Sequence, residues 1–303
     1  MKIAITGASG LIGRSLTTSL AKDGHQVVPV VRRPTSGATE TIEWNPTAGT
    51  IEAAKFEGVD AVVHLAGAGI GDKRWSESYK REILESRTKG TALLASTLAS
   101  LDAPPSVMVS GSAIGFYGDT GNTAVDETAP AGNDFLANVC VEWEAAAAPA
   151  IAAGIRVPLL RTGIVLTADG GALAKMLPLF RFGLGGRMGS GKQWWSWISM
   201  ADEIGAIRWL IDNDISGPVN ATAPTPVTNQ EFTKALGEAM HRPTLAPVPS
   251  FGPKLLLGAE LADALLFTST RVLPGSLTAS GYSFAHPTID AALQDVLASK
   301  TAA

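Results

Sequence analysis

The sequence predicts an α/β protein, built on a doubly wound parallel sheet with a smaller, mainly helical C-terminal region. Short apolar runs alternate with helical patterns through the first half of the chain, and a glycine-rich turn follows the first run. The alternation ends near residue 165. Strand and helix segments that alternate in this way imply parallel strands joined by right-handed crossovers.

The predicted strands are continuous apolar runs, which is typical of strands covered by helices on both faces. They are Lys2–Thr6, Gln26–Val31, Asp60–Ala66, Ser106–Ser110 and Ile155–Arg161. The helical patterns between them predict helices at Leu11–Asp23, Trp75–Leu101 and Phe135–Ala153.

The second half of the chain has a different pattern. The stretch from Gly183 to Gly191 holds five glycines and indicates a loop. Helices are predicted at 200–212, 251–267 and 288–297, with Thr228 or Asn229 as the N-cap of another. We therefore divide the chain into a sheet domain (1–165), completed by a strand near 217–221, and a substrate-side region (166–303) over the carboxyl edge of the sheet, where ligands of such folds bind.

Composition limits the classes of partner. The chain has 303 residues, 46% hydrophobic and 17% charged, with a net charge of −4, which fits a globular protein. A negative chain is a poor match for a nucleic acid polymer or an anionic membrane surface. The single cysteine, Cys140, excludes a disulfide within the chain and fits a reducing compartment. No targeting signal is recognisable at the N-terminus, so we expect a cytoplasmic protein.

A glycine-rich segment connects the first strand to the first helix. Its glycines have the spacing G-x-x-G-x-x-G. The first permits a tight turn, the second lets a pyrophosphate approach the backbone, and the third lets the helix pack on the strand. In its strand-turn-helix context the segment predicts a Rossmann-like dinucleotide site, the alternative being a plain tight turn. The predicted cofactor contacts are Thr6, Gly7, Ser9, Gly10, Leu11, Ile12 and Gly13.

The ends of the next two strands refine this site. Arg32 and Arg33 follow the second strand, where an NAD site usually carries a carboxylate. Guanidinium groups suit a 2′-phosphate, so NADP(H) is the expected cofactor, and two solvated arginines are the alternative. Leu65, Ala66 and Gly67 end the third strand, and the small residues there let a ribose lie close to the backbone. His64 precedes them inside an apolar run, and a core histidine is favoured over a catalytic one.

Later segments carry a resemblance to a known family. They are Arg74-Trp75, Ser86-Arg87, 112–118, Trp143-Glu144, 161–166, Gly185-Gly186, 193–197, 226–229 and 241–243. With the glycine turn, they resemble the extended short-chain dehydrogenase/reductase superfamily, in particular its epimerase-family branch with a C-terminal conserved domain of unknown function. The resemblance places Arg74, Trp75 and Arg87 at the ligand cleft, with Arg87 among the cofactor contacts. Arginines there favour an anionic substrate, and solvated helix charges are the alternative.

The superfamily's catalytic pair is missing from this sequence. Its members use a serine and a Tyr-x-x-x-Lys pair, in which the tyrosine moves the proton and the lysine lowers the tyrosine pKa. Ser112 matches the serine, but Leu136 and Cys140 occupy the other two positions. Leucine cannot move a proton, so the usual mechanism does not carry over to this chain.

Few residues are available as a replacement. Tyr117 is the nearest proton donor in sequence, although a tyrosine packed against the cofactor is the favoured alternative. Cys140 is interpreted as an inert core thiol. Asp119, Asp126, Glu127, Glu142 and Glu144 are interpreted as solvated carboxylates, and no metal-ligand spacing is recognisable. Trp194, Trp195 and Trp197 form either an aromatic binding wall or part of the core.

The resulting hypothesis is an NADP(H)-dependent oxidoreductase or nucleotide-sugar-epimerase-like protein. Ser112 would hold the oxygen of an unknown carbonyl or alcohol, and Tyr117 or water would supply the proton. The alternative is a non-catalytic NADP(H)-binding sensor or partner protein. The expected partner is a small molecule, nucleotide-like or anionic. Dimers are common among relatives, so a homodimer is possible, but the sequence does not determine the oligomeric state.

Overall fold

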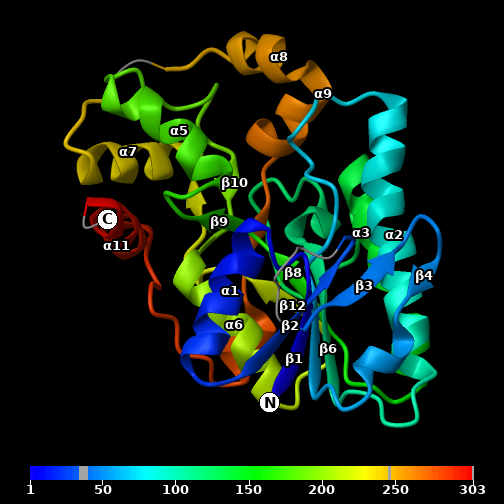
Figure 1. The fold of residues 1–303 in the computed structure, drawn as a ribbon. Coiled ribbons are helices and arrows are strands. Elements are labelled where there is room, and N and C mark those ends of the chain that lie inside the picture. The colour runs from blue at the N-terminus through cyan, green and yellow to red at the C-terminus, as the bar shows by residue number, and fades with distance from the viewer. Residues whose placement is uncertain (34–39, 245–246, 302–303) are drawn as a thin grey trace.

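The computed structural model describes residues 1–33, 40–244 and 247–301. It confirms the predicted fold class: one sheet of eight strands in the order β12-β8-β6-β5-β1-β2-β3-β4 (Figure 1). The strands are β1 (Lys2–Thr6), β2 (Gln26–Val31), β3 (Ile42–Asn45), β4 (Thr50–Ile51), β5 (Ala61–His64), β6 (Val107–Ala113), β8 (Pro158–Thr162) and β12 (Gly217–Ala221). Neighbouring strands are parallel except for β3 and β4. The strand order reverses at β1, so the crevice between β1 and β5 is where a ligand of such a sheet binds.

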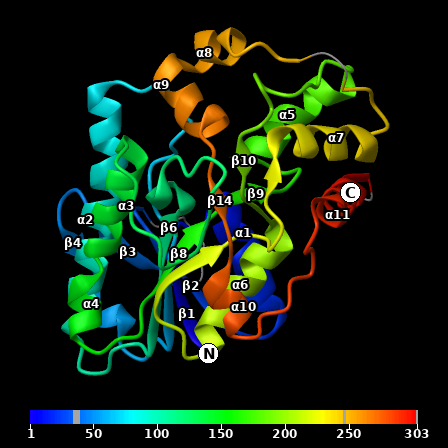
Figure 2. The same ribbon diagram turned by 180° about the vertical axis from the view of Figure 1, so that it is seen from behind.

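Helices cover both faces of the sheet (Figures 1 and 2). Helices α1 (Leu11–Lys22) and α6 (Met200–Asp212) lie on one face, and α2 (Glu77–Ala99), α3 (Phe135–Ala145) and α4 (Ala148–Ala152) lie on the other. In β1, Ile3 and Ile5 join the core under α1 and α6, whereas Ala4 joins the core under α2 and α4. Successive residues of a strand thus meet opposite helix layers, which is why the strands are continuous apolar runs.

The C-terminal region has its own core. Helices α5 (Gly171–Arg181), α7 (Asn229–Ala239) and α11 (Ile289–Thr301) pack around Trp195 and Trp197. Short strand pairs tie this region together: β9 (Ile164–Leu166) with β11 (Trp197–Ser199), β10 (Trp194–Trp195) with β13 (Val227–Thr228), and β7 (Ala124–Val125) with β14 (Arg271–Val272). The predicted N-cap is Thr228, which closes a capping box with Glu231.

A helical stretch crosses the carboxyl end of the sheet. It consists of α8 (Phe251–Leu257), α9 (Ala259–Ala262) and the π-helical turn η3 (Asp263–Phe267), followed by α10 (Gly275–Ala279) beside β12. In Figure 1, α8 and α9 lie at the end of the molecule toward which β1 runs. The region beyond residue 165 therefore contributes α6 and β12 to the sheet layers and α8 and α9 to the ligand edge.

The segment Phe135–Ala152 is long and apolar enough to cross a membrane by length and composition alone. The sequence predicts one helix here. The structure divides it into α3 and α4, and Pro149 stands in the first turn of α4, where its missing N–H costs nothing. Both helices contact α2, so the segment forms part of the layer that covers the sheet.

Candidate functional site

The glycine turn between β1 and α1 is closely packed. Gly7 has a φ of +69°, and a Cβ on it would lie 2.9 Å from the carbonyl carbon of Leu65. A Cβ on Gly13 would overlap the carbonyl oxygen of Gly7, and one on Gly10 would lie 3.1 Å from that same oxygen. The N-cap of α1, Gly10, offers no side-chain acceptor, so the helix N-terminus presents N–H groups to a ligand anion. This arrangement fits a pyrophosphate.

Thr6 holds this turn against the end of β5. Its buried hydroxyl accepts hydrogen bonds from the N–H groups of Leu65 (3.1 Å) and Ala66 (3.2 Å) and pairs with His64 Nδ1 at 2.7 Å. The side chain is fully enclosed, so Thr6 acts behind the predicted cofactor site and its hydroxyl is not available to a ligand. Ser9 and Gly10 are exposed, and Leu11 and Ile12 are half-buried, at the outer side of the same turn.

His64 is a core histidine, as predicted. Its Nε2 pairs with Thr91 Oγ1 at 2.9 Å, and burial lowers its pKa to about 4. Because the Thr6 oxygen already accepts two N–H groups, its own proton goes to His64 Nδ1. Nε2 then carries the ring proton and donates it to Thr91. The ring is neutral and joins β1, β5 and α2.

Arg32 and Arg33 are exposed directly after β2. Neither makes a salt bridge or hydrogen bond within residues 1–33, 40–244 and 247–301. Residues 34–39, which follow them, lie outside the described residues. Among the described residues no carboxylate binds these two guanidinium groups, so their N–H donors are available to a ligand anion at the end of β2.

Ser112 belongs to a charged network at the end of β6. Its Oγ donates to Glu144 Oε1 at 2.7 Å. The same carboxylate is held by Arg161, whose Nε and Nη2 donate to Oε1 and Oε2, each at 2.8 Å. Although burial opposes its charge, Glu144 raises the pKa of Arg161 above the ordinary arginine value. The interpretation of Glu144 as a solvated carboxylate is therefore wrong: it is an enclosed anion held by Arg161 and the hydroxyl of Ser112.

Tyr117 lies in the same network, on the short helix η2 (Ile114–Tyr117). Its hydroxyl accepts from Arg161 Nη1 at 2.9 Å and donates to Asn220 Oδ1 at 2.7 Å. Burial raises the pKa of Tyr117, an effect that the Arg161 charge only partly offsets. The only proton of Tyr117 is donated to Asn220 in a buried contact, which favours the packed alternative over the predicted role as proton donor. The favoured alternative of a packed tyrosine holds.

Leu136, Cys140 and Glu144 form one stripe of α3. A Cβ on Gly115 would lie 3.4 Å from Leu136 Cβ and 3.8 Å from Cys140 Sγ, so the first two face the turn after Ser112. Burial and then the Glu144 charge raise the pKa of Cys140 to about 12. The thiol is inert, as predicted, and this stripe offers no proton donor in place of the missing tyrosine.

The arginines expected in the cleft behave differently from one another. Arg74 donates to the backbone carbonyls of Leu255 and Leu256, so it caps α8 instead of remaining free. Arg87 is buried on α2 beside Gly67, where a Cβ would lie 3.3 Å from the Arg87 guanidinium carbon. Arg74 thus uses its donors on α8, at the ligand edge, whereas Arg87 lies beside the end of β5.

The tryptophan-rich loop serves mainly the core. Trp195 and Trp197 are buried between α5, α7 and α11, so the core alternative holds for both. Trp194 is half-buried and lies under the guanidinium of Arg271, 4.1 Å from its ring centroid. Its Nε1 donates to Asn122 at 3.1 Å.

Two further carboxylates have structural positions. Glu127, also interpreted as solvated, instead accepts from the N–H groups of Asn220 (2.8 Å) and Ser276 (3.1 Å). Glu203 is fully buried on α6 and accepts from Thr162 Oγ1 at 2.9 Å, while its Oε2 has no hydrogen-bond partner. Burial raises the pKa of Glu203 to about 8. Arg161, Asn220 and Glu203 were not predicted as site residues. Arg161 and Asn220 could have been, because they lie near the carboxyl ends of parallel strands, where the residues of a ligand site gather.

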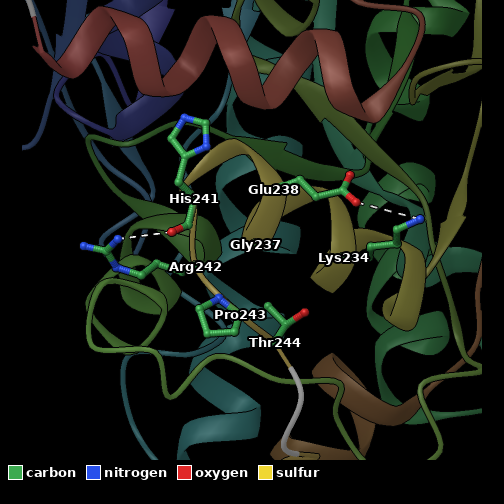
Figure 3. Close-up of a pocket in the computed structure, with 7 residues that line it drawn as sticks. All are labelled: Lys234, Gly237, Glu238, His241, Arg242, Pro243 and Thr244. Atoms are coloured by element: carbon green, nitrogen blue, oxygen red, sulfur yellow. Dashed lines mark hydrogen bonds and ion pairs between the residues drawn. The ribbon is translucent and has the colours of Figure 1, made fainter.

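A surface pocket of about 480 Å³ lies elsewhere, at the C-terminal end of α7 (Figure 3). Lys234 and Glu238 pair on one side at 3.8 Å, and Arg242 donates to the carbonyl of His241 on the other. None of the predicted site residues lines this pocket. The glycine turn and the adjoining strand ends therefore remain the predicted ligand site.

Comparison with known proteins identifies the family. Residues 3–222 match the NAD dependent epimerase/dehydratase family, and residues 248–296 match a domain of unknown function, DUF1731. An epimerase family protein of Mycobacterium tuberculosis is 44% identical over 292 residues, which cover 96% of each chain. The human epimerase family protein SDR39U1 is 35% identical over 302 residues, 98% of this chain and 100% of that one.

Two solved structures share the fold. The crystal structure of human SDR39U1 (isoform 2) with NADPH superposes with a TM-score of 0.88 at 33% identity, over 98% of this chain and 99% of that one. A nucleoside-diphosphate sugar epimerase from Corynebacterium glutamicum gives 0.78 at 36% identity over 98% of this chain, but only 58% of that protein's length is covered. The resemblance to the extended, epimerase-type dehydrogenase/reductases is thus confirmed, and this chain belongs to the NAD dependent epimerase/dehydratase family.

Proposed function

We propose that this chain binds NADP(H) and acts as an oxidoreductase on a small carbonyl or alcohol. The observation that carries the cofactor assignment is the pair of exposed arginines, Arg32 and Arg33, which follow β2 and have no partner among the described residues. A 2′-phosphate would give these two cations a partner, whereas the ribose hydroxyls of NAD would not. The human relative solved with NADPH supports the assignment.

Bound NADPH supplies a hydride from its nicotinamide ring. Ser112 orients the substrate. Its hydroxyl proton is donated to Glu144, so the Ser112 oxygen is left as a hydrogen-bond acceptor. An acceptor at this position matches the hydroxyl group of the alcohol form of the substrate. Reduction adds the hydride to the carbonyl carbon, and the oxygen takes a proton from water, giving the alcohol, NADP⁺ and a hydroxide ion that the solvent neutralises. Water is the proton source because Tyr117 and Cys140 keep their protons in buried contacts.

A second candidate function is a non-catalytic NADP(H) sensor. One observation favours it: among the described residues around Ser112, the hydroxyl groups donate to Glu144 and Asn220, and Leu136 and Cys140 occupy the catalytic positions. A protein that only holds the cofactor has no need of a proton donor.

Cofactor titration followed by a turnover screen tests both functions. We expect NADPH to bind at least tenfold more tightly than NADH, and Arg32→Ala/Arg33→Ala to remove that preference without abolishing NADH binding. We expect oxidation of NADPH with part of a panel of aldehydes, ketones and nucleotide sugars. Ser112→Ala should lower kcat, and Tyr117→Phe should leave it within about threefold once stability is matched.

Equal affinity for the two cofactors would refute the cofactor assignment. Tight NADPH binding without turnover on any member of the panel would favour the sensor. Turnover that Ser112→Ala does not slow would refute the role given to Ser112.

A further inference from the structure

Arg87 is a buried cation without a counter-ion. It is 7% exposed, and within residues 1–33, 40–244 and 247–301 it makes no salt bridge. The other buried arginine, Arg161, is 3% exposed and is neutralised by Glu144. An unpaired charge inside a protein is costly and is retained where something else compensates it. The guanidinium of Arg87 is therefore a candidate ligand-binding group.

The two buried arginines differ in which edge of the guanidinium is used. Arg161 binds the carboxylate of Glu144 through Nε and Nη2, the edge whose two parallel donors match a carboxylate. Arg87 uses only Nη1, which donates to the carbonyls of Ala68 (3.0 Å) and Ile83 (3.1 Å). Its Nε is buried without a partner, and its Nη2 makes no hydrogen bond with the described residues. The carboxylate-binding edge of Arg87 is thus free.

The surroundings hold this free edge in place. Besides its two carbonyl contacts, the guanidinium lies 4.9 Å from the ring centroid of Trp143, whose π face attracts a cation but does not neutralise it. Gly67 also packs closely on the guanidinium, since a Cβ on it would lie 3.3 Å from the Arg87 guanidinium carbon. The aromatic ring and the carbonyls fix the orientation before a ligand arrives, which lowers the entropic cost of binding.

Arg87 is also close to the proposed reaction site. Arg87 and Ser112 both lie close enough to Cys140 to act on its thiol electrostatically, so the two residues share a neighbour. Gly67 follows β5 and Ser112 ends β6, which are neighbouring parallel strands. An anion on Arg87 would therefore occupy the substrate side of the carboxyl edge, next to the oxygen held by Ser112.

We propose that the Nε and Nη2 edge of Arg87 binds a carboxylate of the substrate, so that the enzyme selects carbonyl compounds or alcohols that carry a carboxylate group. This inference rests on the proposed oxidoreductase function and names its substrate class.

Matched pairs of acids and amides test the proposal on the full-length chain saturated with NADP⁺. The probes are pyruvate, oxalate and benzoylformate, each against its neutral amide, with affinity measured by calorimetry. We expect at least one acid to bind ten or more times as tightly as its amide. Arg87→Gln should abolish this preference and leave the Kd for NADP⁺ within twofold, whereas Arg87→Lys should retain part of it.

Arg156→Gln is the matched control. Arg156 also donates to backbone carbonyls, those of Leu210, Ile211 and Ile215, but at the C-terminal end of α6. The Arg156→Gln variant should be less stable than the wild type but should bind acids in preference to amides to the same extent. If Arg87→Gln does not fold, Arg87→Lys must still change the ratio of acid to amide affinity.

Three results would overturn the proposal. They are equal binding of acids and amides by the wild type, an unchanged preference in folded Arg87→Gln and Arg87→Lys, and a loss of NADP⁺ affinity in either variant equal to its loss of acid affinity. The last would assign Arg87 to the cofactor. Failure of the proposed function is distinguishable, because it would appear as absent NADP⁺ binding in the wild type or as absent turnover.

Discussion

At the scale of single residues, the ligand edge depends on one buried ion pair. Arg161 and Glu144 join β8 to α3, and through them the hydroxyls of Ser112 and Tyr117 are positioned. A carboxylate with two guanidinium bonds remains charged, so Glu144 is a structural anion. Its role explains why the usual catalytic positions on the same helix can be occupied by Leu136 and Cys140 without loss of order at the sheet edge.

Breaking this pair should destabilise the protein strongly. Arg161→Leu leaves Glu144 as an enclosed, uncompensated charge, for which we expect a loss of about 3–5 kcal/mol in the free energy of unfolding. Urea denaturation measures the change. Glu142→Gln, on an exposed position of the same helix, should change stability by less than about 0.5 kcal/mol. A loss near that of the control would show that the pair is solvated and that Ser112 is oriented by something else.

The outcome for Tyr117 shows what sequence can and cannot predict at this scale. Its position next to Ser112 in sequence is real, and both residues stand at the carboxyl end of the sheet. The partner that removes its proton, Asn220, lies 103 residues further along the chain. Side-chain direction and such distant partners depend on the packed structure, so the sequence could favour a packed Tyr117 but could not name Asn220 as the group that takes its proton.

At the scale of elements, prediction succeeded where burial imposes a clear period. β1, β2 and α6 have the predicted bounds because the spacing of their apolar residues fits only one kind of element, a strand for the first two and a helix for the third. β3 was missed because it is a short strand of four residues in which buried and exposed residues alternate. α5 was missed because it begins at Gly171 and contains Pro178, both of which usually end or break helices.

The packing of α1 on β1 gives an element-scale prediction. Gly13→Ala places a methyl group on the carbonyl oxygen of Gly7, so α1 must move away from the turn. We expect a loss of about 1–3 kcal/mol in stability and at least tenfold weaker NADPH binding, measured by denaturation and fluorescence titration.

The control is a glycine in open space on another helix. Gly252, in α8, has no neighbour within 4 Å of an added Cβ and has no positive φ. Gly252→Ala should leave NADPH affinity unchanged and stability equal or up to about 1 kcal/mol higher. If both variants bind NADPH like the wild type, the close approach of α1 to the turn is not what forms the cofactor site.

At the scale of the whole molecule, buried titratable groups make stability depend on pH. Burial raises the pKa of Glu203 to about 8, above the ordinary value of 4.5 that it regains on unfolding. The folded state therefore keeps a proton that the unfolded state loses. This contribution to stability is complete below pH 4.5 and disappears as the pH rises to about 8, a change of up to about 5 kcal/mol.

Glu203→Gln should remove this dependence. The variant should gain stability relative to the wild type as the pH rises from 4.5 to 8, and the difference should then level off. Thermal unfolding across that range measures it, with the exposed Glu142→Gln as a control that shows no such gain. A constant difference between Glu203→Gln and the wild type would mean that Glu203 is ionised in the folded protein.

The order of strands in the sheet also determines when the sheet can be completed during synthesis. β8 pairs with β12, yet 54 residues separate Thr162 from Gly217, and they form α5, α6 and the tryptophan strands. A nascent chain that has released β8 therefore carries an open edge of unpaired backbone groups until residue 221 emerges from the ribosome. Such an edge is a template for pairing with another chain. Completion of the sheet during synthesis, and with it escape from aggregation, thus depends on residues that belong to the second half of the sequence.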